Sequence, residues 1–112
     1  MKDYVNPNLL LKKSPHQDGY YYGTIHQITE FERYKEKIIK IKIRVDDNVF
    51  FFTFSSVIDI KHPLYPLAKK LTEISDKENR ALSINDFANC NIRFKISDEE
   101  TGILQVTTME YV

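Results

Sequence analysis

The stretch IIKIKIRVDDNVFFFTF, residues 38–54, decides the fold of this chain. In its first half isoleucine stands at positions 39, 41 and 43, and the alternating positions carry the cations Lys40, Lys42 and Arg44. Successive side chains of a strand point to opposite faces of a sheet, so this alternation predicts a strand with one buried face and one basic face. The second half, Val49 to Phe54, has phenylalanine at 50, 51, 52 and 54 and predicts a second strand.

Asp46-Asp47-Asn48 supplies turn-forming residues between these two strands, which together predict a β-hairpin. A two-residue turn sets the isoleucines across from the phenylalanines at 50, 52 and 54, and it places Val49, Phe51 and Thr53 on the face of the cations. A three-residue turn would set lysines beside core phenylalanines. The composition of the two faces therefore selects the even register.

Outward from the hairpin, the tyrosine-rich segment from Tyr20 to about Ile28 predicts a first strand. The strand that contains the isoleucines is expected to run from Tyr34 to Val45, with Phe31 and Tyr34 in or at the loop before it. After the hairpin, Pro63 and Pro66 indicate a helix start. One apolar stripe at helical spacing follows, made of Leu64, Leu67, Ala68, Leu71 and Ile74.

Ser75 to Arg80 is expected to form a polar loop, and Ile84 and Phe87 are expected to anchor a short turn. Two more strands follow, one in which apolar residues alternate from Cys90 to Ile96 and one from Ile103 to about Tyr111. The acidic loop 98–102 joins them.

The resulting order is β-β-β-α-β-β, which is that of the OB fold, a five-stranded Greek-key barrel. We expect an all-β domain with one helix over residues 19–112. An irregular arm, residues 1–18, precedes it, and its Leu9-Leu10-Leu11 triplet is expected to pack on a partner subunit.

The length of 112 residues fits one domain, and 16 basic residues balance 16 acidic ones. Such balance counts against a nucleic-acid binder unless the cations gather on one face. Cys90 is the only cysteine, which excludes an intrachain disulfide and favours a reducing compartment. No apolar run approaches the roughly 20 residues that cross a bilayer, and the first residues lack the apolar core of a signal peptide. We therefore expect a cytoplasmic protein without a membrane partner.

Binding of single-stranded nucleic acid requires cations for phosphates and aromatic faces for bases. Cations are concentrated between residues 33 and 44, and the hairpin register places one phenylalanine among them. Aromatic residues of the first strand and cations of the fourth would extend this surface. The candidate nucleic-acid-binding residues are Tyr20, Tyr22, Arg33, Tyr34, Lys35, Lys37, Lys40, Lys42, Arg44, Phe51, Arg93 and Lys95.

Each of these residues also has a purely structural interpretation. A lysine-rich outer face often serves only solubility and protection against edge pairing. Phe51 could bury itself in a dimer interface, and tyrosines of a first strand are frequent cross-strand packing partners.

No other chemistry is indicated by the sequence. His16, His26 and His62 lack metal-ligand spacing, and the acidic turns match no calcium-binding loop. There is no Gly-rich phosphate loop, and Cys90 alternates with core residues like a small hydrophobe. We expect no metal site, no cofactor and no enzymatic activity.

The strand order, the hairpin IIKIKIRVDDNVFFFTF and the segment INDFANCNIRFKISDEETGILQV, residues 84–106, resemble one family over residues 20–111. It is the small OB-fold single-stranded DNA-binding proteins encoded by phages and mobile elements of low-GC Gram-positive bacteria. The resemblance implies binding of single-stranded DNA in replication or recombination, often by dimers or tetramers. The chain departs from the cellular bacterial members because it has no tryptophan and no acidic, Phe-terminated tail for partner recruitment.

The sequence thus predicts sequence-tolerant binding of single-stranded DNA by a homo-oligomer. RNA binding on the same face stays open, since the 2′-hydroxyl distinguishes the two ligands. The alternative is a protein-interaction module that binds and modulates a host or replication enzyme. Charge neutrality and the leucine triplet of the arm favour that alternative.

Overall fold

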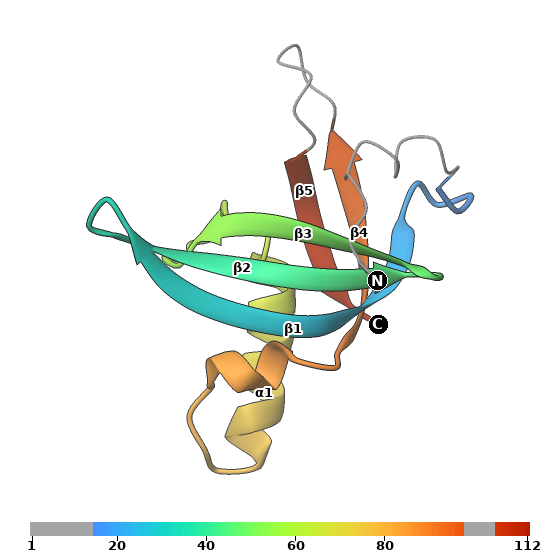
Figure 1. Cartoon of the computed structure of the whole chain (residues 1–112). Helices are drawn as coiled ribbons and strands as arrows, with labels where there is room; N and C mark the ends of the chain where they lie inside the picture. Colours follow the sequence, from blue (N-terminus) through green and yellow to red (C-terminus); the bar gives the residue numbers. More distant parts are fainter. Residues whose placement is uncertain (1–14, 98–104) are drawn as a thin grey trace.

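The computed structural model describes residues 15–97 and 105–112. Within these residues five antiparallel strands form one sheet, and one α-helix lies between the third and fourth strands (Figure 1). The expected mostly-β fold and its β-β-β-α-β-β order are confirmed. The elements are β1 (Tyr21–Arg33), β2 (Glu36–Val45), β3 (Asn48–Ser55), α1 (Tyr65–Lys77), the 3₁₀ helix η2 (Ile84–Phe87), β4 (Asn91–Ser97) and β5 (Gln105–Tyr111).

The strands lie in the order β3-β2-β1-β4-β5, and β1 is shared between the two halves of the sheet. Its first residues pair with β4 and the rest pair with β2, while β4 and β5 stand across the direction of the other three strands (Figure 1). Over the described ranges no ladder joins β3 to β5, so the OB-type barrel is open between its edges. There the segment before α1 meets β5, where the Met109 amide donates to the Pro63 carbonyl at 2.9 Å.

The register of the β2–β3 hairpin is the one that the sequence predicts. Ile43 pairs with Phe50, Ile41 pairs with Phe52, and Ile39 lies opposite a phenylalanine as well, Phe54. The three isoleucines are 0–5 % exposed and belong to the main hydrophobic core. The two-residue turn consists of the aspartates at 46 and 47, so the asparagine at 48 opens β3 and is not part of the turn.

The β1–β2 hairpin is longer than expected. Arg33 still pairs with Glu36, which leaves only Tyr34 and Lys35 for the turn. Phe31, which we expected in a loop, is therefore a strand residue, and β2 begins two residues later than predicted. Both turn residues have positive φ, 51° and 66°, as the twist-compatible two-residue hairpin turn requires.

A β-bulge at His26 reverses the alternation of β1. The register shifts between Ile25 and Gln27, so that Ile25 and Ile28 both point into the core at 0 % and 9 % exposure. Bulges add local twist and bend a strand. Here the bend lies just after Thr24, the residue that pairs with both β2 and β4.

The predicted stripe faces the core: Leu64, the N-cap of α1, and Leu67 are fully buried, and Leu71 is 5 % exposed. Ala68 and Ile74 are partly buried against the same core. The helix extends to Lys77, so the polar loop that we expected from Ser75 begins later. Ser75 is only 1 % exposed, and its hydroxyl donates to the Thr72 carbonyl at 3.0 Å. A buried polar side chain whose hydrogen bond is made inside its own helix carries no desolvation penalty that would end the helix.

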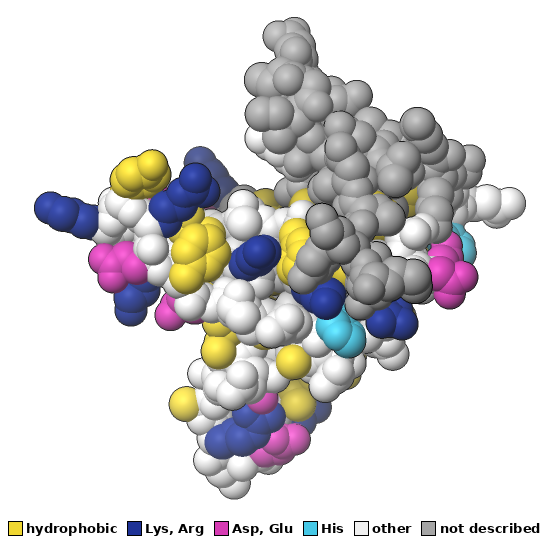
Figure 2. Space-filling view, viewed as in Figure 1, with side chains coloured by type: hydrophobic (Ala, Val, Ile, Leu, Met, Phe, Trp, Pro, Cys, Tyr) yellow, Lys and Arg dark blue, Asp and Glu magenta, His cyan; other side chains and the backbone are white. Residues whose placement is uncertain are grey.

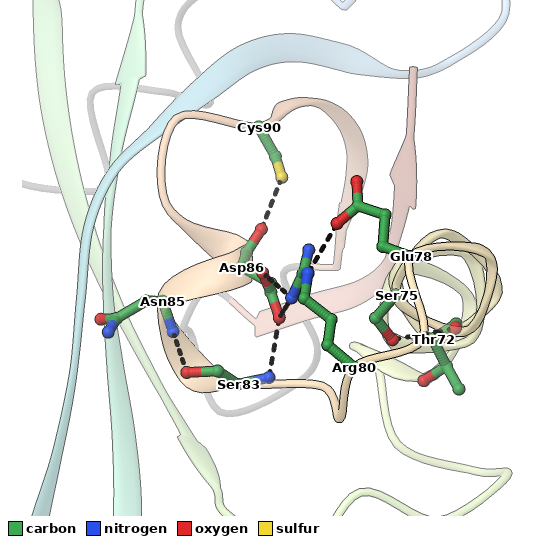
Figure 3. A network of polar contacts seen from close by, with 8 residues as sticks. All are labelled: Thr72, Ser75, Glu78, Arg80, Ser83, Asn85, Asp86 and Cys90. Atoms are coloured by element: carbon green, nitrogen blue, oxygen red, sulfur yellow. Dashed lines mark hydrogen bonds and ion pairs between the residues drawn. The ribbon is translucent and has the colours of Figure 1, made fainter.

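A polar network ties the end of α1 to η2 (Figure 3). Arg80 donates from Nη1 to both carboxylate oxygens of Asp86, at 2.7 and 2.8 Å, and from Nε to Glu78. This guanidinium lowers the pKa of the Asp86 carboxyl, which also accepts the Ser83 amide in a capping box. The network fixes the turn that buries Phe87, so the predicted anchor is confirmed.

Several predicted features lie outside the described residues. They are the leucine triplet and most of the rest of the arm, the acidic loop 98–102 and the start of the last strand at Ile103. Among those that are described, no helix is long and apolar enough to span a membrane.

Gly23 lies at the corner where β1 passes from β4 to β2. A Cβ atom at this position would lie 2.6 Å from the Arg44 carbonyl oxygen and 3.1 Å from Ile43 Cγ2. Because the closest atom belongs to the backbone, it cannot rotate away. We predict that Gly23→Ala lowers the free energy of unfolding by about 1–3 kcal/mol in urea denaturation, which is the usual cost of overpacking.

Gly19 provides the matched control for that variant. Its φ is +83°, and a Cβ there would meet only the end of the Lys95 side chain at 3.9 Å. Asparagine enters this backbone conformation more readily than other residues with a side chain, so Gly19→Asn is expected to cost less stability than Gly23→Ala. Equal stability of Gly23→Ala and the wild type would contradict the close strand crossing.

Candidate nucleic-acid interface

The outer face of the β2–β3 hairpin combines cations with one aromatic ring, as the register predicts. Lys40 and Lys42 point away from the core, and Lys42 pairs directly with Phe51. The Lys40 Nζ atom lies 4.4 Å from the Phe51 ring centroid, and the Lys42 Nζ atom lies 5.9 Å from it. Phe51 is half-buried, unlike its fully buried neighbour Phe50. One ring therefore shares an outer surface with two ammonium groups.

β1 extends this surface because of its bulge. Beyond His26 the odd-numbered residues face outward, so Thr29 pairs with Lys40 and Phe31 pairs with Ile38. Phe31 is 38 % exposed. We call this surface the ribbon face, and it is formed by Phe31, Arg33, Ile38, Lys40, Lys42, Arg44 and Phe51. Over β1–β3 hydrophobic and basic side chains lie next to one another on the side seen in Figure 2.

The tip of the β1–β2 hairpin presents a second ring. Tyr34 is 90 % exposed, and the Arg33 guanidinium lies 5.7 Å from its ring centroid. Tyr34 and Lys35 are both non-glycine residues at positive φ, a conformation that costs of order 1–3 kcal/mol per residue and is concentrated at functional sites. Tyr34 is thus held in solvent at the end of the ribbon face.

The predicted run of cations between residues 33 and 44 does not lie on one face. Lys37 pairs with Glu32 and has the parity of the core isoleucines, so it projects from the opposite face of the hairpin. Lys35 lies in the turn. On the ribbon face itself, Lys40 and Arg44 have no carboxylate within salt-bridge distance among the residues that the structure describes.

The remaining four predicted residues form a separate group, which we call the β4 cluster: Tyr20, Tyr22, Arg93 and Lys95. Tyr22 pairs with Arg93 across the β1–β4 ladder. The Tyr20 ring lies 4.5 Å from the Arg93 guanidinium carbon and 4.7 Å from Lys95 Nζ, measured from the ring centroid. The expected meeting of aromatic residues and cations is thus present here too.

Two carboxylates that were not among the predicted site residues accept hydrogen bonds from the β4 cluster. Glu110 on β5 pairs with Arg93 in the strand register and accepts a hydrogen bond from the Arg93 Nη2 atom at 2.8 Å. It also accepts the Tyr20 hydroxyl, and Asp18 accepts the Tyr22 hydroxyl. The hydrogen bond from Tyr20 and the charge of Arg93 lower the pKa of Glu110, so this carboxylate stays ionised at neutral pH.

The ribbon face and the β4 cluster meet at Thr24, which pairs with both Arg44 and Asn91. The Thr24 hydroxyl donates to the Asn91 side-chain oxygen at 3.0 Å. A surface hollow of about 400 Å³ opens here, lined among others by Tyr22, Thr24, Arg44, Asp46 and Asn91. The twelve candidate residues, Lys37 excepted, therefore follow a path from the hairpin tip across the sheet to β4.

The other polar groups of the described chain form no further candidate site. The structure brings no three His, Cys, Asp or Glu side chains of residues 15–97 and 105–112 into an arrangement that could hold a metal ion. Cys90 packs partly buried against the core, and its thiol donates to the Asp86 carbonyl at 3.2 Å. Burial raises the pKa of this thiol, which makes it a poor nucleophile.

Comparisons of the chain with protein-family models, curated proteins and solved structures found no match.

Phe51 and Phe50 provide a test of the two faces. Phe50 is fully buried in the core, so Phe50→Ala should lower the free energy of unfolding by about 3–5 kcal/mol. Phe51 is half-buried on the outer face, so Phe51→Ala should cost less than half as much. Chemical denaturation of both variants measures the difference, and equal costs would show that Phe51 is a core residue.

Proposed function

We propose that this protein binds single-stranded nucleic acid, DNA in the first place, along the ribbon face and without sequence preference. The observation that carries the proposal is the pair of lysines at Phe51, with ammonium groups 4.4 and 5.9 Å from its ring centroid. Stacking of one base on an aromatic side chain contributes roughly 1–3 kcal/mol, and nearby cations attract the phosphates on either side of that base.

Binding would exchange partners on Phe51. A base that stacks on the ring replaces the Lys40 ammonium above it, and the displaced ammonium moves to the adjoining phosphate. Tyr34 at the hairpin tip would offer a further platform, with Arg33 beside it. An aromatic face accepts every base, and a lysine contacts the backbone, so these groups give affinity without sequence readout.

The neutral net charge of the chain fits such a site. The 16 acidic residues balance the 16 basic ones overall, but Lys40 and Arg44 have no acidic partner among the described residues. Only a few phosphates would be neutralised, so the salt dependence should be shallower than that of a strongly basic protein. We place the protein in the cytoplasm, since one partly buried cysteine suits a reducing compartment.

A titration of fluorescently labelled oligo-dT, followed by anisotropy over a salt series, tests the proposal. Phe51→Ala should weaken binding roughly 5- to 150-fold, the equivalent of one lost stacking contact, with little change in the salt slope. Lys40→Ala should also weaken binding and reduce the slope of log K against log salt by about 0.7, because one phosphate contact is lost.

Lys69→Ala, which removes an exposed cation from α1, is the matched control and should bind like the wild type. Saturating wild-type protein that gives no anisotropy change at low salt would overturn the proposal. Competition with an RNA oligomer of the same sequence decides which of the two nucleic acids is preferred.

We further propose that the protein acts as a dimer or tetramer. β3 and β5 are the edge strands of the sheet and pair with no further strand over the described residues, and open edges in small β proteins favour association. Light scattering at micromolar concentration should therefore give a multiple of the 13.2 kDa chain mass. A mass equal to that of one chain would contradict this part of the proposal.

A further inference from the structure

The two parts of the candidate interface differ in whether a carboxylate pairs with their cations. On the ribbon face Lys40 and Arg44 lie without an acidic partner among the described residues. In the β4 cluster both oxygens of Glu110 are engaged. One oxygen accepts from Arg93 Nη2 at 2.8 Å and Nε at 3.3 Å, and the other accepts the Tyr20 hydroxyl.

Arg93 donates from Nη2 and Nε to the same oxygen of Glu110, a charge-assisted contact that a phosphate oxygen could replace. A guanidinium offers parallel N–H donors that suit a carboxylate or a phosphate equally well. Glu110 approaches this fork from the neighbouring strand, directly opposite Arg93 in the β4–β5 register. The side chain of Glu110 is 27 % exposed and that of Arg93 is 37 % exposed, so an anion from solvent can reach the pair.

The aromatic part of the cluster is occupied in the same way. The Tyr20 ring lies close to both Arg93 and Lys95, and its hydroxyl is fixed by Glu110. A base could stack on this ring only after a cation moves away from it. Such a cation moves readily if a phosphate arrives together with the base.

We propose that Glu110 holds the position of a nucleic-acid phosphate on Arg93, and that a strand long enough to reach β4 displaces it and opens a second subsite. This inference rests on the proposed function. Tyr20, Arg93 and Lys95 form the subsite, which accepts one nucleotide of the strand already bound on the ribbon face. The ligand is thus a single strand long enough to reach both the ribbon face and the β4 cluster. Glu110 sets the affinity for the part of the strand that reaches the β4 cluster.

The path between the subsites supports this order of events. Arg44 at the end of the ribbon face and Tyr22 of the β4 cluster both line the hollow of about 400 Å³. A strand that leaves Arg44 therefore passes through this hollow to Arg93. The hollow is open to solvent, and its lining mixes polar residues such as Thr24 and Asn91 with the apolar Ile92 and Val112, so a nucleotide can cross it. Asp46 also lines the hollow, and Arg44 offsets its charge.

Displacement of Glu110 exchanges one anion for another at Arg93, so it adds little net affinity in the wild type. If the carboxylate is removed, the phosphate binds Arg93 without displacing an anion, and the affinity for the strand should increase. The gain should appear only with strands that span both subsites. A short strand occupies the ribbon face alone and does not contact Arg93.

The test compares Glu110→Gln with the wild type on two labelled oligo-dT strands. One has about 5 nucleotides, near the lower end of the site sizes of OB folds, and the other about 20, beyond their upper end. Glu110→Gln should bind the long strand roughly 1.5- to 5-fold more tightly, the equivalent of one released partly exposed ion pair. Its salt slope should steepen by up to about 0.7, because a phosphate then occupies Arg93 in every complex and not only in the fraction from which Glu110 is displaced. Affinity for the short strand should not change.

Glu73→Gln is the matched control, since Glu73 forms an exposed pair with Lys70 on α1 and its loss changes the net charge equally. It should bind both strands like the wild type. In an Arg93→Gln background the further change Glu110→Gln should have no effect, because the group that Glu110 shields is gone. Tyr20→Phe, which removes the other contact of Glu110, should give a smaller gain on the long strand.

Two outcomes would overturn the inference while leaving the proposed function intact. The first is that Glu110→Gln and the wild type bind the long strand with equal affinity. The second is an equal gain for Glu110→Gln and Glu73→Gln on both strands, which would be an effect of net charge alone. If neither the wild type nor the variant binds any strand, the proposed function itself fails.

Discussion

The burial of Ile39, Ile41 and Ile43 against Phe50 and Phe52 is the constraint on which the rest of the structure depends. Full burial of each such side chain contributes roughly 1.5–3 kcal/mol, and a slip of one residue would turn all of them toward solvent. The register is therefore strongly determined. Because the side chains alternate, the same register fixes the outward direction of the intervening lysines and of the ring between them. The chemistry of the outer face is thus a consequence of how the core packs.

Neutral net charge is compatible with the proposed binding surface because the charges are distributed unevenly. Acidic residues stabilise structure in some places, as Asp86 does with Arg80 at the end of α1, and shield a cation in another, as Glu110 does on β4. The ribbon face has cations without such partners among the described residues. The bend of β1 at Gly23 and His26 joins these regions, since it lets one strand pair with both β2 and β4. The bend of β1 therefore both curves the sheet and connects the ribbon face with the β4 cluster.

Much of the fold could be predicted from the sequence, because period-two and helical patterns record which side chains are buried. The hairpin register, the apolar stripe of α1 and the β-β-β-α-β-β order followed from these patterns. The bulge at His26 did not, since an extra residue in a strand leaves no mark in a polar segment, and Phe31 was consequently assigned to a loop. Lys37 was grouped with cations of the other face although its parity, that of Ile39 and Ile41, could have been read from the alternation. Glu110 was missed because its role depends on the pairing of β4 with β5, which no local pattern encodes.

Residue-level NMR during a titration with oligo-dT is the most direct measurement of whether the outward face of the hairpin binds nucleic acid. The account predicts that the largest chemical-shift changes occur at Lys40, Lys42 and Phe51, while the amides of α1, residues 65–77, stay in place. Shift changes confined to α1, or spread evenly over the chain without saturation, would contradict it.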